Sequence, residues 1–180
     1  MEALPLKWYK IAIDSNDSFL DITKKLAKKN IDSALFPNSV YVIRIAKGFI
    51  IEYPKKKLSP VIYIGQGKLR GRFFAHRKWL GKFSSLLHGV QLEASFCFPK
   101  SPEGSGLNKQ LEAHLINRFE QVHGRKPLNN KKREPLDPDF KHSAKLDGQV
   151  FGNGIGKKYP WAISPRKGNP FLERGTKNDA

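Results

Sequence analysis

Residues 61–76 constrain the fold of this chain most, because an apolar run there passes directly into a basic segment. The stretch reads V-I-Y-I-G-Q-G-K-L-R-G-R-F-F-A-H. The apolar run predicts a strand that ends at Tyr63 and Gly65, since glycine lets the backbone turn or a ligand approach closely. A turn at Gly67 then leads into a predicted helix over residues 69–80. One face of this helix carries Leu69, Phe73, His76 and Leu80.

The same stretch predicts an anion site. Arg72 lies one helical turn before His76, at the edge of the same face. This spacing brings a cation and an imidazole close to Tyr63 at the strand end. Because a guanidinium pairs well with phosphate oxygens, phosphate is the obvious ligand.

The charge of the chain favours a polyanionic partner. Among 180 residues, Lys and Arg number 33 and Asp and Glu number 16, which gives a formal charge of +17. The basic residues are spread along the chain, and the pI is about 10.0. Such a field concentrates polyanions, so we expect nucleic acid binding that weakens steeply with salt. A membrane surface is the weaker alternative, because no basic helix carries a strong apolar face.

Length and cysteine content indicate one intracellular domain with appendages. A hydrophobic fraction of 39% is enough to fill a core. The single cysteine, Cys97, lies in the apolar run A-S-F-C-F and is expected to be a small buried side chain. No segment is long enough to span a membrane, and the N-terminus lacks the apolar core of a signal peptide. We therefore expect a cytoplasmic protein.

Flanking patterns predict the other elements. Ser18, with Asp21 three residues later, is a plausible N-cap for a helix in residues 1–37. Strands are expected from Ser39 and over residues 90–98, and F-I-I-E-Y at residues 49–53 is a possible further strand. Gly81 is a predicted stop for the helix over residues 69–80.

The clearest helical pattern covers residues 107–123 and is closed by Gly124. Glu112 projects toward the core side of this helix. A buried carboxylate is costly unless it is paired or bound to a cation, so a structural ion pair and a metal ligand are equally open. The turn R-K-P-L-N-N follows. Residues 132–180 are basic and weakly periodic, and either wrap the domain or order only on nucleic acid.

Taken in order, these elements resemble the GIY-YIG nuclease family. The residues that carry the match are S-V-Y at 39–41, Y-I-G at 63–65, Arg72, His76, Glu112 and the Asn after K-P-L. The resemblance covers residues 38–131, about half of the chain. It implies an α+β fold with a small central three-stranded antiparallel sheet flanked by helices. Residues 1–37 would then be an N-terminal appendage with a helix, and residues 132–180 a basic C-terminal extension.

The sequence departs from the family pattern at three points. The first glycine of the family motif is Ser39 here, and a small serine is expected to replace it. The spacing from Tyr41 to Tyr63 is longer than usual in the family, which predicts an insertion over residues 49–59. Asn129 and Asn130 are both candidates for the family asparagine, and Asn129 is preferred because it directly follows P-L.

The resemblance also implies roles for individual residues. Glu112 would hold one divalent cation, Mg²⁺ or Mn²⁺, since a lone carboxylate favours a one-metal site. Arg72 would stabilise charge on the scissile phosphate. The implied catalytic set is Tyr41, Tyr63, Arg72, His76, Glu112 and Asn129, and the implied contacts to nucleic acid are Gly65, Lys68, Arg70 and Lys78.

Tyr41 would contact the attacking water and act as the base, with His76 helping to take the proton. A phenol with a pKa near 10 is a poor base at neutral pH, so Tyr41 would need cationic neighbours that lower its pKa. Tyr63 would orient water or phosphate, and Asn129 would hold the geometry through its amide. Each side chain also has an ordinary structural reading, as a strand aromatic, a surface cation, a core histidine or a turn former.

The leading functional prediction is a metal-dependent endonuclease that acts on double-stranded DNA, in restriction, homing or mobile-element cleavage, or repair. A restriction-type enzyme would act as a homodimer on a symmetric site. One alternative is a catalytically inactive nucleic-acid-binding protein on the same fold, favoured by the charge and by Ser39. Another is an RNA-binding protein, suggested by the scattered basic and aromatic residues.

Overall fold

The fold consists of helices packed on mainly antiparallel sheets. The computed structural model describes residues 6–86, 90–99, 106–131, 135–136, 148, 150–152 and 161–164. Its elements are β1 (Trp8–Ile13), α1 (Phe19–Ala27), the 3-10 helix η1 (Ser33–Asn38), β2 (Ser39–Lys47), β3 (Phe49–Tyr53), β4 (Lys57–Ser59), β5 (Val61–Gly67), α2 (Leu69–Leu86), β6 (Gln91–Cys97), α3 (Leu107–His123) and β7 (Trp161–Ile163). The predicted α+β class is confirmed.

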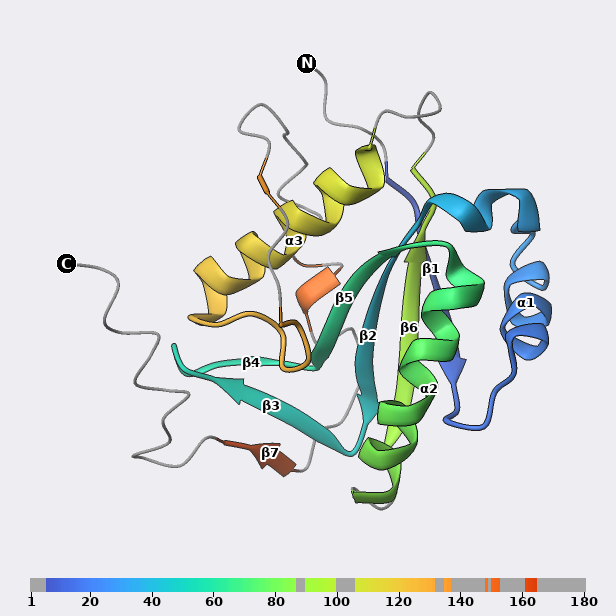
Figure 1. The fold of residues 1–180 in the computed structure, drawn as a ribbon. Helices are drawn as coiled ribbons and strands as arrows, with labels where there is room; N and C mark the ends of the chain where they lie inside the picture. Colours follow the sequence, from blue (N-terminus) through green and yellow to red (C-terminus); the bar gives the residue numbers. More distant parts are fainter. Residues whose placement is uncertain are drawn as a thin grey trace.

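The central sheet has four antiparallel strands in the order β1-β6-β2-β5 (Figure 1). The resemblance implied three. The additional strand is β1, which pairs with β6 from Trp8 opposite Cys97 to Ile13 opposite Leu92. Ile11 and Ile13 are buried in the same core cluster as β2, so the N-terminal segment is part of the packed unit. Cys97 is buried, as its apolar surroundings predict.

The predicted start of α1 is confirmed. Ser18 Oγ accepts a hydrogen bond from the Asp21 backbone N–H, and the Asp21 carboxylate accepts one from the Ser18 backbone N–H. This capping box satisfies two donors at the helix start. Ile22 and Leu26 then bury the apolar side of α1.

A second, smaller sheet has the order β4-β3-β7. The extra residues between Tyr41 and Tyr63 form its β3-β4 hairpin, and β7 pairs with β3 in parallel. Val150 and Phe151 are buried, and Ser59 Oγ donates to the Phe151 carbonyl at 3.0 Å. This part of the C-terminal extension therefore wraps the domain, while most of residues 132–180 lie outside the described residues.

Helix α2 covers one face of the central sheet (Figure 1), where Leu69 and His76 meet Tyr41 and Phe96. It continues to Leu86, so the predicted stop at Gly81 is wrong. Gly81 is not among the glycines with positive φ and so provides no left-handed cap. A Cβ at Gly81 would lie 3.9 Å from the Ser15 side chain, so the helix passes Ser15 at ordinary contact distance.

Helix α3 ends at Gly124, whose φ of 80° gives the left-handed cap predicted from the sequence. The helix lies against β5 and β2. Near its start Asn108 Nδ2 donates to Gln66 Oε1 at 2.7 Å, and beyond its end the Lys55 backbone N–H donates to the His123 carbonyl at 3.2 Å. Both sheets thus hold α3 in place. Among the described residues, no helix is long and apolar enough to cross a membrane.

Candidate active site

Two tyrosines meet over a glycine at the centre of the candidate site. Tyr41 on β2 lies directly opposite Gly65 on β5, and Tyr63 precedes Gly65 by two residues on the same face. The ring centroids of Tyr41 and Tyr63 are 6.0 Å apart. A Cβ on Gly65 would lie 2.5 Å from Tyr63 Cε1 and 2.7 Å from the Tyr41 hydroxyl oxygen. The rings can therefore meet only because position 65 has no side chain.

Helix α2 adds a histidine and a tryptophan behind the tyrosines. Tyr41 Oη lies 2.6 Å from His76 Nε2, and Trp79 Nε1 donates to His76 Nδ1 at 2.9 Å. His76 and Trp79 are three residues apart, so they project from one side of the helix. His76 is 7% exposed, and Tyr41 is 3% exposed. Both partners of this short contact are thus shielded from water.

The tryptophan determines which nitrogen of His76 carries the proton. Burial, with a smaller effect of the Arg72 charge, lowers the pKa of His76 to about 4, so the ring is neutral at pH 7. An indole N–H can only donate, so Nδ1 of His76 must accept. The single ring proton is then on Nε2, which donates to Tyr41 Oη.

Because Tyr41 Oη accepts from His76, its own O–H is free to point toward the oxygen of the neighbouring Tyr63. This contact raises the pKa of Tyr41 further and opposes the rise that burial causes in the pKa of Tyr63. The hydrogen bonds therefore run in one direction, from Trp79 through His76 and Tyr41 to Tyr63. Tyr63 is half-buried, whereas Tyr41 and His76 are buried, so Tyr63 is the more exposed of the two tyrosines.

Both phenols are protonated at neutral pH. Burial first, then the neighbouring Tyr63, raises the pKa of Tyr41, and burial first, then Glu112, raises the pKa of Tyr63. The Arg72 charge opposes both shifts but is outweighed. Of the neighbours expected to lower the pKa of Tyr41, Arg72 acts in that direction but is outweighed by burial, and the neutral His76 supplies no charge.

Opposite charges act on the tyrosine pair from two helices. Arg72 on α2 is exposed, and its Nε lies 3.5 Å from where a Cβ of Gly67 would be. Glu112 on α3 is 8% exposed. Their opposing effects on the pKa of Tyr63 show that both lie close enough to influence it.

Glu112 is the carboxylate that the candidate site offers to a metal ion. Among the described residues, no group of three or more His, Cys, Asp or Glu side chains could hold a metal. A site with a single buried carboxylate does fit Mg²⁺, because this ion keeps several waters and takes further oxygen ligands from substrate phosphates. Glu112 is thus compatible with the expected single cation.

The two asparagines after α3 have different roles. Asn130 accepts from the Ile64 backbone N–H at 2.9 Å through Oδ1 and donates to the Ile64 carbonyl at 2.7 Å through Nδ2. Asn129 contacts β5 through its backbone N–H, which donates to the Ile62 carbonyl at 2.9 Å. The bracing amide that was expected of Asn129 therefore belongs to Asn130, which holds the outer edge of the strand carrying Tyr63.

The turn from β5 into α2 presents basic residues beside the tyrosines. Gly67 has a φ of 111°, and Ser39 Oγ donates to its carbonyl at 2.7 Å, so the buried Ser39 supports the turn. Lys68 and Arg70 are exposed, although the Arg70 guanidinium lies 5.9 Å from the Phe19 ring centroid on α1. Lys78 lies on α2, and its side chain is outside the described part of the chain.

Comparisons of the chain with protein-family models, with curated proteins and with solved structures find no match. The resemblance to GIY-YIG nucleases therefore stays a prediction from the sequence. The site brings together five of the six expected polar residues: Tyr41, Tyr63, Arg72, His76 and Glu112. Sequence reasoning missed Trp79, for which the spacing of three residues from His76 was the available signal.

Proposed function

We propose that this protein is a divalent-metal-dependent endonuclease that hydrolyses DNA phosphodiester bonds. The observation that carries the proposal is the directional chain of hydrogen bonds that ends at Tyr63, between the Arg72 cation and the Glu112 carboxylate. A chain of donors aimed at one phenol oxygen stabilises negative charge there. Such an arrangement suits an oxygen that must hold negative charge before it takes a proton.

In the proposed reaction Tyr63, and not Tyr41, contacts the attacking water. Tyr41 is 3% exposed, whereas Tyr63 is half-buried and reaches solvent. Tyr63 would first ionise and release its own proton to solvent, and the phenolate would then take the water proton. Tyr41 would donate to that phenolate, and His76 Nε2 would donate to Tyr41, so the ionised form is stabilised without movement of the rings.

Arg72 would bind the scissile phosphate. Its guanidinium is exposed beside the tyrosine pair, and two parallel N–H donors suit two phosphate oxygens. The same charge opposes the rise that burial causes in the pKa of Tyr63, so phosphate binding and base activation would depend on one residue. Asn130 would keep β5, and with it Tyr63, in register with β2.

Glu112 would hold the Mg²⁺ or Mn²⁺ ion. When bound, such an ion supplies positive charge that stabilises the phosphate and activates water. The carboxylate is buried, and a bound cation would offset part of the cost of burying its charge. The net charge of +17 supports a nucleic acid substrate, and double-stranded DNA remains the proposed partner.

A catalytically inactive nucleic-acid-binding protein is the second candidate. Its support is that burial holds both tyrosines protonated at neutral pH. The same basic surface would then bind DNA or RNA without cleavage. Assembly as a homodimer belongs only to the endonuclease proposal of restriction type.

A plasmid cleavage assay separates these candidates. Wild type and Glu112→Gln are incubated with supercoiled DNA in Mg²⁺, Mn²⁺ or EDTA, after both are shown to fold and to bind DNA. If wild type nicks the plasmid only when metal is present, and Glu112→Gln does not nick it, the endonuclease proposal is supported. Binding without cleavage in every metal, on DNA and on RNA, would favour the binding protein.

A further inference from the structure

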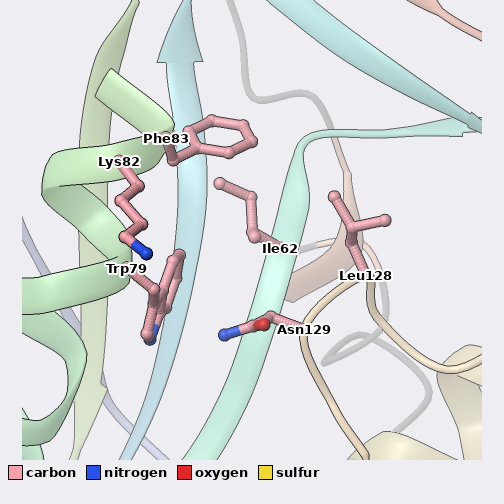
Figure 2. A pocket seen from close by; sticks show the side chains of 6 residues that line it. All are labelled: Ile62, Trp79, Lys82, Phe83, Leu128 and Asn129. Carbon is pink, nitrogen blue, oxygen red and sulfur yellow. The ribbon is translucent and has the colours of Figure 1, made fainter. Parts of the chain in front are cut away.

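An open pocket adjoins the tyrosine pair between α2 and the turn after α3 (Figure 2). Its volume is about 250 Å³. It is lined by Ile62, Trp79, Lys82, Phe83, Leu128 and Asn129. The Trp79 ring centroid lies 6.2 Å from that of Tyr63, so the pocket begins where the candidate active site ends.

The walls of the pocket are aromatic and aliphatic. Trp79 uses its only N–H to donate to His76, which leaves its ring to line the pocket. Phe83 and Ile62 add apolar surface, and Leu128 is 49% exposed at the opposite wall. A flat apolar ring would remove this surface from water.

Two polar groups border the apolar surface. The Asn129 side chain points into the pocket, across from Trp79 (Figure 2). Within the described residues its amide has no hydrogen-bond partner, so one acceptor and two donors remain available. Lys82 is exposed at the rim and supplies a positive charge.

We infer that this pocket takes one unstacked nucleobase of the nucleic acid strand whose phosphate lies at Arg72. The inference rests on the proposed function and specifies how its substrate is held. The cavity is smaller than the roughly 300–1,000 Å³ of pockets that enclose whole ligands, so it suits a single flat ring. Trp79 stacks on the base, Asn129 meets its polar edge, and Lys82 meets a flanking phosphate.

The test compares short probes with and without a base. The full chain, in EDTA, is titrated with the dinucleotide d(pTpT) and with its analogues that lack one base. Removal of the base in the pocket is expected to raise Kd at least about 5-fold, the lower end of the effect of a base stacked on an aromatic side chain. In ¹⁵N-resolved NMR, d(pTpT) shifts the Asn129 side-chain amide signal, and inorganic phosphate leaves it in place.

Matched leucines provide the control, since Leu128 and Leu58 are each 49% exposed but only Leu128 lines the pocket. Leu128→Ala and Asn129→Ala are expected to reduce the ratio of the Kd for the abasic probe to the Kd for the intact probe. Leu58→Ala should leave the ratio at the wild-type value, and Lys82→Ala should weaken both probes alike.

Three results would overturn the inference. If wild type binds the abasic and intact probes equally, the pocket takes no base, even where the protein cuts DNA. If Leu128→Ala behaves as Leu58→Ala does, the base preference arises elsewhere. Failure to bind any nucleic acid, long DNA included, would overturn the proposed function and the pocket together.

Discussion

Replacement of Gly65 by alanine tests whether the two tyrosines meet because this position lacks a side chain. The added methyl carbon would lie 2.5 Å from Tyr63 Cε1 and 2.7 Å from Tyr41 Cζ and Oη, whereas ordinary contacts begin at 3.4 Å. Each ring must therefore move by about 0.7–0.9 Å. Such a movement separates Tyr41 Oη from His76 Nε2, which now lie 2.6 Å apart.

The expected cost follows from these contacts. Overpacking of a buried site costs about 1–3 kcal/mol, and loss of the Tyr41–His76 hydrogen bond adds about 1 kcal/mol. The free energy of unfolding should fall by about 2–4 kcal/mol, which corresponds to a Tm lower by about 4–16 °C for a chain of this size. Cleavage should fall by about 100-fold or more, because reacting groups are displaced by about 1 Å.

Gly71→Ala is the matched control. Gly71 is exposed on α2, and a Cβ there would meet nothing within 4 Å. Alanine stabilises an exposed helix by up to about 1 kcal/mol relative to glycine, so Tm should rise by a few degrees. Calorimetry gives both Tm values, and plasmid nicking gives the activity. A Gly65→Ala protein with wild-type Tm and wild-type cleavage would refute the steric argument.

Three further predictions concern the partners of the tyrosines. Asn130→Ala should lower the free energy of unfolding by about 1–3 kcal/mol, since the Ile64 backbone loses both partners, whereas Asn129→Ala should change it little. Equal effects of the two substitutions in urea denaturation would contradict the separate roles of the two asparagines. Trp79→Phe should free Nδ1 of His76, so ¹⁵N NMR should show the Nε2–H form in wild type and a mixture of tautomers in the variant. The pKa of His76 is about 4 in the folded protein and 6.5 in its ordinary state, so the unfolded chain binds more protons between these pH values. The free energy of unfolding should therefore fall by about 3 kcal/mol as the pH drops from about 6.5 to 4, and it should fall less in His76→Gln.

Local signals in the sequence were sufficient for several elements. Ser18 with Asp21 indicated the start of α1, and Gly124 indicated the end of α3, because caps depend on a few neighbouring residues. The helix stop predicted at Gly81 was wrong, since glycine inside a helix costs only about 1 kcal/mol and tertiary packing can offset that cost. The pairing of β1 with β6 joins residues far apart in the chain, and no local pattern encodes it.

The sequence predicted which residues form the candidate site, but not how their side chains are arranged. Periodicity put Tyr41, His76 and Glu112 on the right elements. The order of the hydrogen bonds depends on which side chain packs behind which, so the greater exposure of Tyr63 than of Tyr41 could not be predicted from the sequence. The exchange of roles between the two asparagines has the same origin.

The turn that braces β5 also limits how copies of this protein can associate. Asn129 and Asn130 occupy backbone groups of Ile62 and Ile64 along the outer edge of β5. A strand from a second chain cannot pair there, so the central sheet can be extended only at its opposite edge, along β1. Even there Lys25 Nζ donates to the Ala12 carbonyl. A second copy that adds a strand to the central sheet would therefore have to displace this lysine contact at β1.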